Sequence, residues 1–400
     1  MVDENLAWKM VYAAALFSLL ILGIAYYLIS PKDTSAPEED KANRSAEFRQ
    51  AAVAGRQDGH KVWEFSAGSG WTEKGSQRTN LAGISNGRIY SGGKLVIADL
   101  AAPRALAGRN AEFVEASGPL TARLNLKRLA ASTGSGRWSK LRADYIKYIP
   151  TDKRSEIRGN IILTLNDGVI RAGRIVIDHQ KKLASITDQV RVRRANGLIS
   201  TASLEYWADP ERADVPVPLA LDLKEHQLAT RVTAGRGTFF MDANKDIDLA
   251  GSLEVTQGKK AAVADAGVYS RRHDRLSLRG RTRTVLEKAA TLLKADSAAR
   301  LREPKVKEIL RQKTVVTADE MVFSTRTGDA RAAGRVVATQ KGKEAKADFA
   351  AYDDKHELLK LSGNVYLKKG DDWIACRQVI ISIGKETFEA FGVKEAQFKL

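Results

Sequence analysis

The residues Gly83-Ile84-Ser85-Asn86-Gly87 match the G-x-S-x-G pattern, in which a nucleophilic serine performs acyl transfer in hydrolases. That chemistry needs a strand before the serine and a helix after it, so that the hydroxyl is exposed on a sharp turn. The residues from Arg88 to Gly93 have the composition of a turn and a strand, and no helix is predicted there. A hydrolase that uses Ser85 is therefore kept only as an alternative.

Histidines and carboxylates form no other recognisable catalytic or metal-binding group. The five histidines are scattered, and none stands three or four residues from another or close to Cys376, so no metal-ligand spacing exists. Asp319 and Asp348 are 29 residues apart, and each follows an alanine at a predicted strand start, which favours a structural turn over a catalytic pair. The sequence accordingly predicts no catalytic residue, no metal and no cofactor, and we do not expect an enzyme.

The net charge of +17 indicates an anionic partner, such as nucleic acid, a lipid headgroup or a phosphorylated glycolipid. The alternative is that lysine and arginine on strand edges prevent sheet-to-sheet aggregation. Arginines cluster at 191–194 and 279–283, but single-strand binders also need aromatic side chains on the same face. Aromatic residues make up 7% of the chain and do not interleave with these arginines, so nucleic acid is not expected as a partner.

Alternation of apolar and polar residues dominates the chain from residue 60 onward. Along 157–165, 247–255 and 359–367, apolar residues and a glycine occupy one parity, while the other parity is mostly polar. Successive side chains of a strand point to opposite faces, so each stretch predicts a strand with one buried face. Gly334 and Gly363 are 29 residues apart, as are other glycines of the chain. This period predicts stacked copies of one β unit that bury their apolar faces together.

The N-terminal part of the chain has a different composition. We expect residues 1–30 to form a single transmembrane anchor rather than a cleaved signal peptide, because their apolar stretch is long enough to span a bilayer. The membrane-embedded residues would include Met10, Leu16, Leu20 and Ile29. Residues 31–59 are polar and lack periodicity, which predicts a flexible linker. Basic residues are more numerous after the stretch, which taken alone would leave the C-terminal part in the cytoplasm.

Two interruptions of the period divide the rest of the chain. Prolines within Asp209–Pro218 predict an edge strand or a junction, so we place a boundary between residues 60–218 and 219–400. The segment 285–313 has helical composition and spacing, and Pro304 should divide it into two pieces. The predicted fold class is mainly β. A transmembrane helix precedes one long or two stacked antiparallel β-jellyrolls, with a short helical insertion near 285–313.

Several segments resemble the repeat of the OstA-like family, the lipopolysaccharide-transport β-jellyroll proteins that include LptA, LptC and the N-terminal domain of LptD. These segments are Thr317–Phe323 with Gly334, Lys346–Asp353 with Gly363, and Leu141–Tyr145 with Gly159. The resemblance covers roughly residue 141 to the C-terminus. With the anchor and linker, residues 60–218 look like an LptC-like jellyroll. The additional residues 219–400 look like a second, OstA- or LptA-like one.

The resemblance implies a lipid-transfer function. It implies a single-pass inner-membrane protein whose C-terminal part lies in the periplasm. Such a protein accepts lipopolysaccharide from an ABC transporter of the LptB/LptF/LptG type and passes it along an apolar groove toward the outer membrane. It also implies that an LptA- or LptD-type jellyroll joins by edge-strand addition. The alternative is a structural β-solenoid scaffold of the cell envelope without lipid cargo.

The expected groove-lining residues are apolar and share the buried parity of their strands. They are Ile161, Leu163, Leu165, Leu249, Leu253, Val255, Val336, Leu361, Val365 and Leu367. The strand predicted over Trp373–Ile383 is also long and apolar, and an uncovered edge of this kind pairs with another chain. We expect it to be the docking edge for the next jellyroll. The alternative is that Lys385–Leu400 folds back and covers it.

Overall fold

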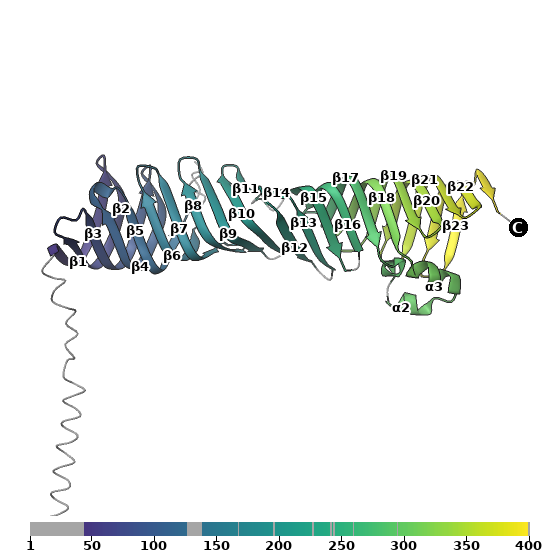
Figure 1. Ribbon diagram of the computed structural model, residues 1–400, viewed down its shortest axis with the longest axis horizontal. Helices are drawn as coiled ribbons and strands as arrows, with labels where there is room; N and C mark the ends of the chain where they lie inside the picture. Colours follow the sequence, from purple (N-terminus) through teal and green to yellow (C-terminus); the bar gives the residue numbers. More distant parts are fainter. Residues whose placement is uncertain are drawn as a thin grey trace, which may run out of the picture.

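The computed structural model describes residues 44–125, 138–166, 168–194, 197–225, 228–240, 242, 245–258, 260–293 and 295–398. Within these residues the chain forms 24 β-strands that join in one antiparallel sheet. The strands lie side by side along a long body, with β1 at one end and β23 near the other (Figure 1). Two short α-helices project from one side of this body near its C-terminal end.

The elements up to β10 follow one another with short connections. They are β1 (Arg44–Gln57), β2 (His60–Glu73), β3 (Arg78–Ser91), β4 (Lys94–Gly108), the 3₁₀ helix η2 (Arg109–Ala111), β5 (Val114–Leu124), β6 (Ser139–Ile149), β7 (Arg154–Thr164), β8 (Gly168–Asp178), β9 (Leu183–Arg194) and β10 (Gly197–Ala208).

The remaining elements include the other helices that the structure describes. They are β11 (Glu211–Val215), β12 (Leu219–Glu225), β13 (Leu228–Ala234), β14 (Arg236–Phe240), β15 (Ile247–Gln257), β16 (Lys260–Ser270), β17 (Arg275–Leu286), the 3₁₀ helix η4 (Ala289–Leu292), α2 (Ala295–Arg300), α3 (Pro304–Arg311), β18 (Thr314–Ser324), β19 (Ala330–Gln340), β20 (Lys343–Asp353), β21 (Leu358–Lys369), β22 (Asp372–Ser382), β23 (Thr387–Phe391) and β24 (Glu395–Gln397).

The sheet continues without a break through the predicted boundary near residue 218. β11 and β12 pair with opposite ends of β10, and β14 and β13 pair with opposite ends of β15. Each pair of short strands therefore acts as one long strand that is interrupted in its middle. Pro216 and Pro218 fall in the first interruption, where proline removes no ladder hydrogen bond. The division into jellyrolls 60–218 and 219–400 stays a prediction, because a continuous sheet does not test it.

A bend near the middle of most of the long strands folds the sheet into two facing walls. The pairing register shifts there in strand after strand, for example between Arg279 and Thr282 in the β17–β18 pair. A β-bulge of this kind bends the strand and changes the direction of its second half. Thr284 on one side of the bend donates a hydrogen bond to the sulfur of Met321 on the other side, at 3.0 Å. The two halves of the strands therefore face each other across a buried interior.

The bend divides each long strand in which it occurs into two halves, and each half pairs with the matching half of the neighbouring strand. Wall A is the series of paired halves that includes the half with Thr284. Wall B is the series that includes the half with Met321. Edge A is the line of strand ends that bounds wall A, as at Lys260 and Leu286. Edge B is the line that bounds wall B, as at Arg275 and Ser324. The mouth is the line along which edge A and edge B approach each other, opposite the bends.

The predicted fold class needs a correction at the N-terminus. No helix among the described residues is long and apolar enough to cross a membrane. The helices α2 and α3 have only six and eight residues. The expected anchor, with Met10, Leu16, Leu20 and Ile29, lies outside the described residues. The described fold is a mainly β protein without the predicted transmembrane helix.

Two further segments differ from expectation, and one agrees. Residues 44–57 of the predicted linker form β1, whose polar sequence suits an edge strand that pairs only with β2. The strand expected to be an open edge is covered, because β23 and β24 both pair with β22, so that prediction is wrong. The helices η4, α2 and α3 lie within the predicted insertion 285–313, and Pro304, the first residue of α3, separates α3 from α2, in agreement with the predicted division at this residue.

Candidate functional site

The interior between the walls is apolar and collects the predicted groove residues in two clusters. Eight of the ten lie on wall A or at its bend, and only Leu249 and Leu361 lie on wall B. All are buried except Leu165 and Leu367, which are half-buried. The cluster that extends from β2 to β19 contains Ile161, Leu163, Leu249, Leu253, Val255 and Val336, with Leu165 packed against it. A second cluster holds Leu361 and Val365, with Leu367 packed against it.

The acidic residues with the 29-residue spacing lie at the bends. Asp348 faces Gly363 on the next strand, where a Cβ atom would lie 2.5 Å from the Oδ2 atom of Asp348. Gly363 has a φ of +74°, a conformation that glycine adopts at little cost. The same arrangement recurs for Asp144 with Gly159, Asp265 with Gly280, and Asp319 with Gly334. Asp319 and Asp348 thus make a structural contact, but at bends in the middle of β18 and β20 and not at the predicted strand starts.

The residue after each of these glycines binds the carboxylate. Asn364 donates to Asp348 at 3.0 Å, and Arg335 donates to Asp319 through two nitrogens. Hydrogen bonds from Arg335 lower the pKa of Asp319, and those from Arg281 lower the pKa of Asp265 in the same way. The carboxylates of Asp319 and Asp265 are therefore held ionised by the arginines that bind them at the bend.

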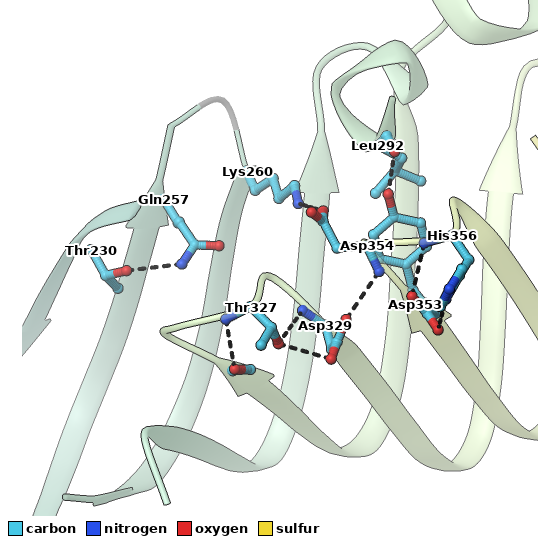
Figure 2. A network of polar contacts seen from close by, with 11 residues as sticks. Thr230, Gln257, Lys260, Leu292, Thr327, Asp329, Asp353, Asp354 and His356 are labelled. Carbon is cyan, nitrogen blue, oxygen red and sulfur yellow. Dashed lines mark hydrogen bonds and ion pairs between the residues drawn. The ribbon is translucent and has the colours of Figure 1, made fainter. Parts of the chain in front are cut away.

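The mouth is closed by different contacts along its length. Near the N-terminal end, the hydroxyl of Tyr148 at edge B donates a 2.8 Å hydrogen bond to the carbonyl of Tyr90 at edge A. Burial raises the pKa of Tyr148, so the hydroxyl stays protonated and able to donate. Further along, the ammonium of Lys260 at edge A lies 3.7 Å from the carboxylate of Asp354 at edge B (Figure 2). The interior is therefore shielded from solvent at both places.

An interior pocket of about 100 Å³ lies between the walls near the middle of the sheet. Its lining is mainly apolar and includes Ile199 and Leu221 of wall A and Phe239 and Tyr269 of wall B. Arg194 at edge A and Arg271 at edge B also line it. The guanidinium of Arg271 donates to the carbonyls of Phe240, Asp242 and Lys245, which fixes it beside the pocket. An apolar space with cations at its rim suits a chain that carries an anionic head.

Two buried or strongly hydrogen-bonded titratable groups stand near the strand ends. Burial lowers the pKa of His179 to about 4, and its Nε2 atom lies 2.8 Å from the hydroxyl of Ser155. The Nδ1 atom of His179 is buried and has no hydrogen-bond partner in the described part of the chain. Hydrogen bonds from Lys61 and then Tyr90 lower the pKa of Glu64 to about 2. Both groups hold strands together.

The serine motif does not form a nucleophile elbow. Ser85 lies inside β3 opposite Ser66 of β2, and the strand continues to Ser91 without a helix. The residues described in the structure include no group of three or more metal-binding side chains. The apolar interior between the walls offers a place to bind apolar chains.

Sequence reasoning missed the residues that close the mouth. Tyr90, Tyr148, Lys260 and Asp354 stand at strand ends that belong to different repeats, so their sequence positions give no signal of contact. Such pairs depend on the twist that accumulates over several strands. In contrast, the alternation of apolar and polar residues along each strand was enough to assign each groove residue to the buried face.

Comparison with known proteins adds one finding. A family described as LptA/(LptD N-terminal domain) LPS transport protein matches residues 140–387, which is more than half of the chain. The match begins in β6 and ends at the start of β23, so it crosses the predicted boundary near residue 218. No curated protein matches the chain.

Proposed function

The chain belongs to the family of LptA and LptD N-terminal lipopolysaccharide-transport proteins, and we propose that it carries lipopolysaccharide through the interior between its two walls. The observation that supports this proposal is the continuous apolar lining, which runs from β2 to β22 in two successive clusters. Each CH₂ group that an acyl chain buries is worth about 0.8 kcal/mol, so several chains could be held without covalent chemistry. The protein is proposed to act as a carrier and not as an enzyme.

We further propose that the described residues work in the periplasm, between an inner-membrane ABC transporter of the LptB/LptF/LptG type and an outer-membrane-side jellyroll. Headgroup phosphates would meet lysine and arginine at the edges of the walls, and Arg194 and Arg271, which line the interior pocket, are placed for this role. The family match supports lipopolysaccharide transport as such. The identity of each partner rests on the resemblance to LptA, LptC and LptD.

We propose the C-terminal edge of the sheet as the docking edge, in place of the strand Trp373–Ile383. β23 and β24 form the C-terminal edge, and their apolar side chains are exposed, with Phe388 at 51% and Phe391 at 45%. An edge of this kind adds a strand from another jellyroll.

Phe388→Asp with Phe391→Asp is expected to stop copurification with an LptA- or LptD-type partner. Phe349→Asp is the matched control, since Phe349 is 57% exposed but lies on β20, inside the sheet. Equal loss in both variants would argue against this edge.

Site-specific photo-crosslinking tests the cargo. Probes at Leu163, Leu253 and Val365 point into the interior, whereas probes at the neighbouring exposed positions Glu254 and Asn364 do not. Crosslinks to lipopolysaccharide from the inward positions alone are the expected result. If the inward probes stay silent while the chain is folded and expressed, lipid transport is excluded.

A structural scaffold is the second candidate, and the closed mouth favours it. The hydrogen bond from Tyr148 to Tyr90 ties the two edges together, and the side chains beneath it are packed as in an ordinary core. A scaffold would keep this interior filled by its own side chains at all times. The same crosslinking experiment separates the two functions, because only the carrier admits lipid.

A further inference from the structure

The segment Glu287–Lys313, which contains η4, α2 and α3, is an addition that the sheet does not need. It joins β17 to β18 at edge A, where Leu286 pairs with Thr314. At three other connections on the same edge, the paired strand ends are joined by only two residues, as in Gln257 with Lys260, Gln340 with Lys343 and Lys369 with Asp372. The register at Leu286 and Thr314 is that of these tight hairpins, so a two-residue turn would also close this one.

This segment extends from edge A across the mouth to edge B. On the side of edge A, Gln340 donates a 2.9 Å hydrogen bond to the carbonyl of Ile309 in α3. On the side of edge B, the hydroxyl of Tyr352 donates to the carbonyl of Leu292. The carboxylate of Glu386, also beyond edge B, accepts hydrogen bonds from the backbone nitrogens of the residues before α3. We call the segment Glu287–Lys313 the strap.

The apolar side of the strap fills the mouth. Leu301 and Leu310 are 7% and 6% exposed, and they form a buried cluster with Tyr352 and Ile383 of edge B. Leu359 and Ile381 pack against this cluster. The same two residues pack against the interior cluster beneath it, which contains Val365. The strap therefore continues the apolar interior outward to the surface.

The outer side of α3 is polar, since Lys307, Glu308 and Arg311 are exposed. α2 and α3 have six and eight residues, and helices of this length are not stable alone in water. Their form therefore depends on the apolar surface against which they pack. An acyl chain in the same place would bury the same apolar surface. The strap and an acyl chain therefore compete for this surface through the same hydrophobic interaction.

We infer that the space held by the strap, between Tyr352, Leu359, Ile381 and Ile383, is an acyl-chain site, and that the strap is its built-in occupant. The strap closes this part of the groove when it is empty and leaves the mouth when a lipid chain enters. This inference rests on the proposed function, because it takes lipopolysaccharide as the cargo. Beyond transport itself, the inference places an acyl-chain site near the C-terminal end of the groove and identifies the strap as the segment that controls access to this site.

The test compares the complete chain with a strapless variant in which a Lys-Gly turn, the sequence of residues 341–342, replaces residues 287–313. A photo-crosslinking residue at Leu359 reports on the site under the strap, and one at Leu163 reports on the groove far from it. With lipid A in detergent as the probe, loss of the strap is expected to increase crosslinking at Leu359 at least fivefold. Crosslinking at Leu163 should not change.

A second variant keeps the strap but prevents its movement. Arg302→Cys with Glu386→Cys, joined by a short bismaleimide, ties the strap to edge B, while Cys376 is buried and should not react. Crosslinking at Leu359 is expected to fall below that of the untreated protein. Each single-cysteine variant treated with the same reagent serves as the control. Hydrogen exchange of α3 should increase when lipid A is added to the complete chain and not to the tied form.

The outcomes separate this inference from the proposed function. Equal crosslinking at Leu359 in the complete, strapless and tied proteins, with lipid A clearly bound at Leu163, overturns the strap and leaves transport intact. Silence at both positions in all three proteins overturns transport and the strap together. A gain at Leu359 on strap removal, with a loss on tying, supports both.

Discussion

Where a bend contains an Asp–Gly contact, this contact should be a principal determinant of the stability of its repeat. Gly363→Ala places a methyl group 2.5 Å from Oδ2, 2.9 Å from Cβ and 3.0 Å from Cγ of Asp348. Gly370→Ala is the matched control, because Gly370 also has a positive φ, of +60°, but nothing lies within 4 Å of its new Cβ. Both positions belong to the β20–β22 region, and only the first is at a bend.

The expected costs differ by several kcal/mol. Each alanine in the left-handed conformation costs about 1–2 kcal/mol. In Gly363→Ala, Asp348 must also move away, which adds an overpacking cost of about 1–3 kcal/mol. Loss of the 3.0 Å hydrogen bond from Asn364 to Asp348 adds about 1 kcal/mol. We expect Gly363→Ala to destabilise its repeat by about 2–4 kcal/mol more than Gly370→Ala does.

The assay must report on this repeat alone, because stacked repeats contact mainly their neighbours and can open locally. Cys376 provides such a probe, since it is 1% exposed, pairs with Val365 and has a pKa raised by burial. Its rate of reaction with a thiol reagent measures the open fraction, and 2 kcal/mol corresponds to a rate increase of about 30-fold.

The double variant Gly363→Ala with Asp348→Gly removes all three close contacts at once. Its stability should therefore exceed the value expected from adding the two single effects, by at least about 1 kcal/mol. The reasoning is refuted if Gly363→Ala and Gly370→Ala accelerate the Cys376 reaction equally. It is also refuted if the double variant shows no coupling.

Three further predictions concern titration and the mouth. Because the pKa of His179 falls from 6.5 unfolded to about 4 folded, stability should decline by up to about 3 kcal/mol as pH drops from 6.5 to 4, and His179→Gln should remove this slope in urea titrations. The pKa of Glu64 is lowered from 4.5 to about 2, so its stabilisation is complete above pH 4.5 and lost as pH falls toward 2; Glu64→Gln should destabilise the chain at pH 7 but not at pH 2. Tyr148→Phe removes the hydrogen bond across the mouth, should cost about 1 kcal/mol, and should increase lipid crosslinking at Leu163; unchanged crosslinking would show that this bond does not control entry.

Local patterns predicted the elements well wherever one face was buried. Leu361 and Val365 were assigned to the interior from parity alone, and both are buried. The spacing of Gly334 and Gly363 pointed to a repeated structural feature, which the structure identifies as the bend. The insertion was recognised from composition because its helices do not share the strand period.

The strands and contacts that were missed have two physical causes. β1 and β23 are edge strands with one neighbour each, so more of their side chains face solvent and the alternation that marks a strand is weak. The contact from Lys260 to Asp354 joins strands that are far apart in the pairing order. Such a contact depends on bend and twist angles that no local sequence pattern encodes.

The closed mouth can be reconciled with transport if it opens one section at a time. Each section is closed by a different kind of contact. These are the hydrogen bond from Tyr148, the ion pair of Lys260 and the strap near Tyr352. Opening one section leaves the pairing of the others intact, because each strand is bonded only to its neighbours in the sheet. A lipid that advances in this way displaces a few contacts at a time, and the hydrogen bonds of the walls are kept throughout. A carrier can thus combine a dry, stable interior with a passage for lipid. Opening of a single section can be measured most directly at the strap.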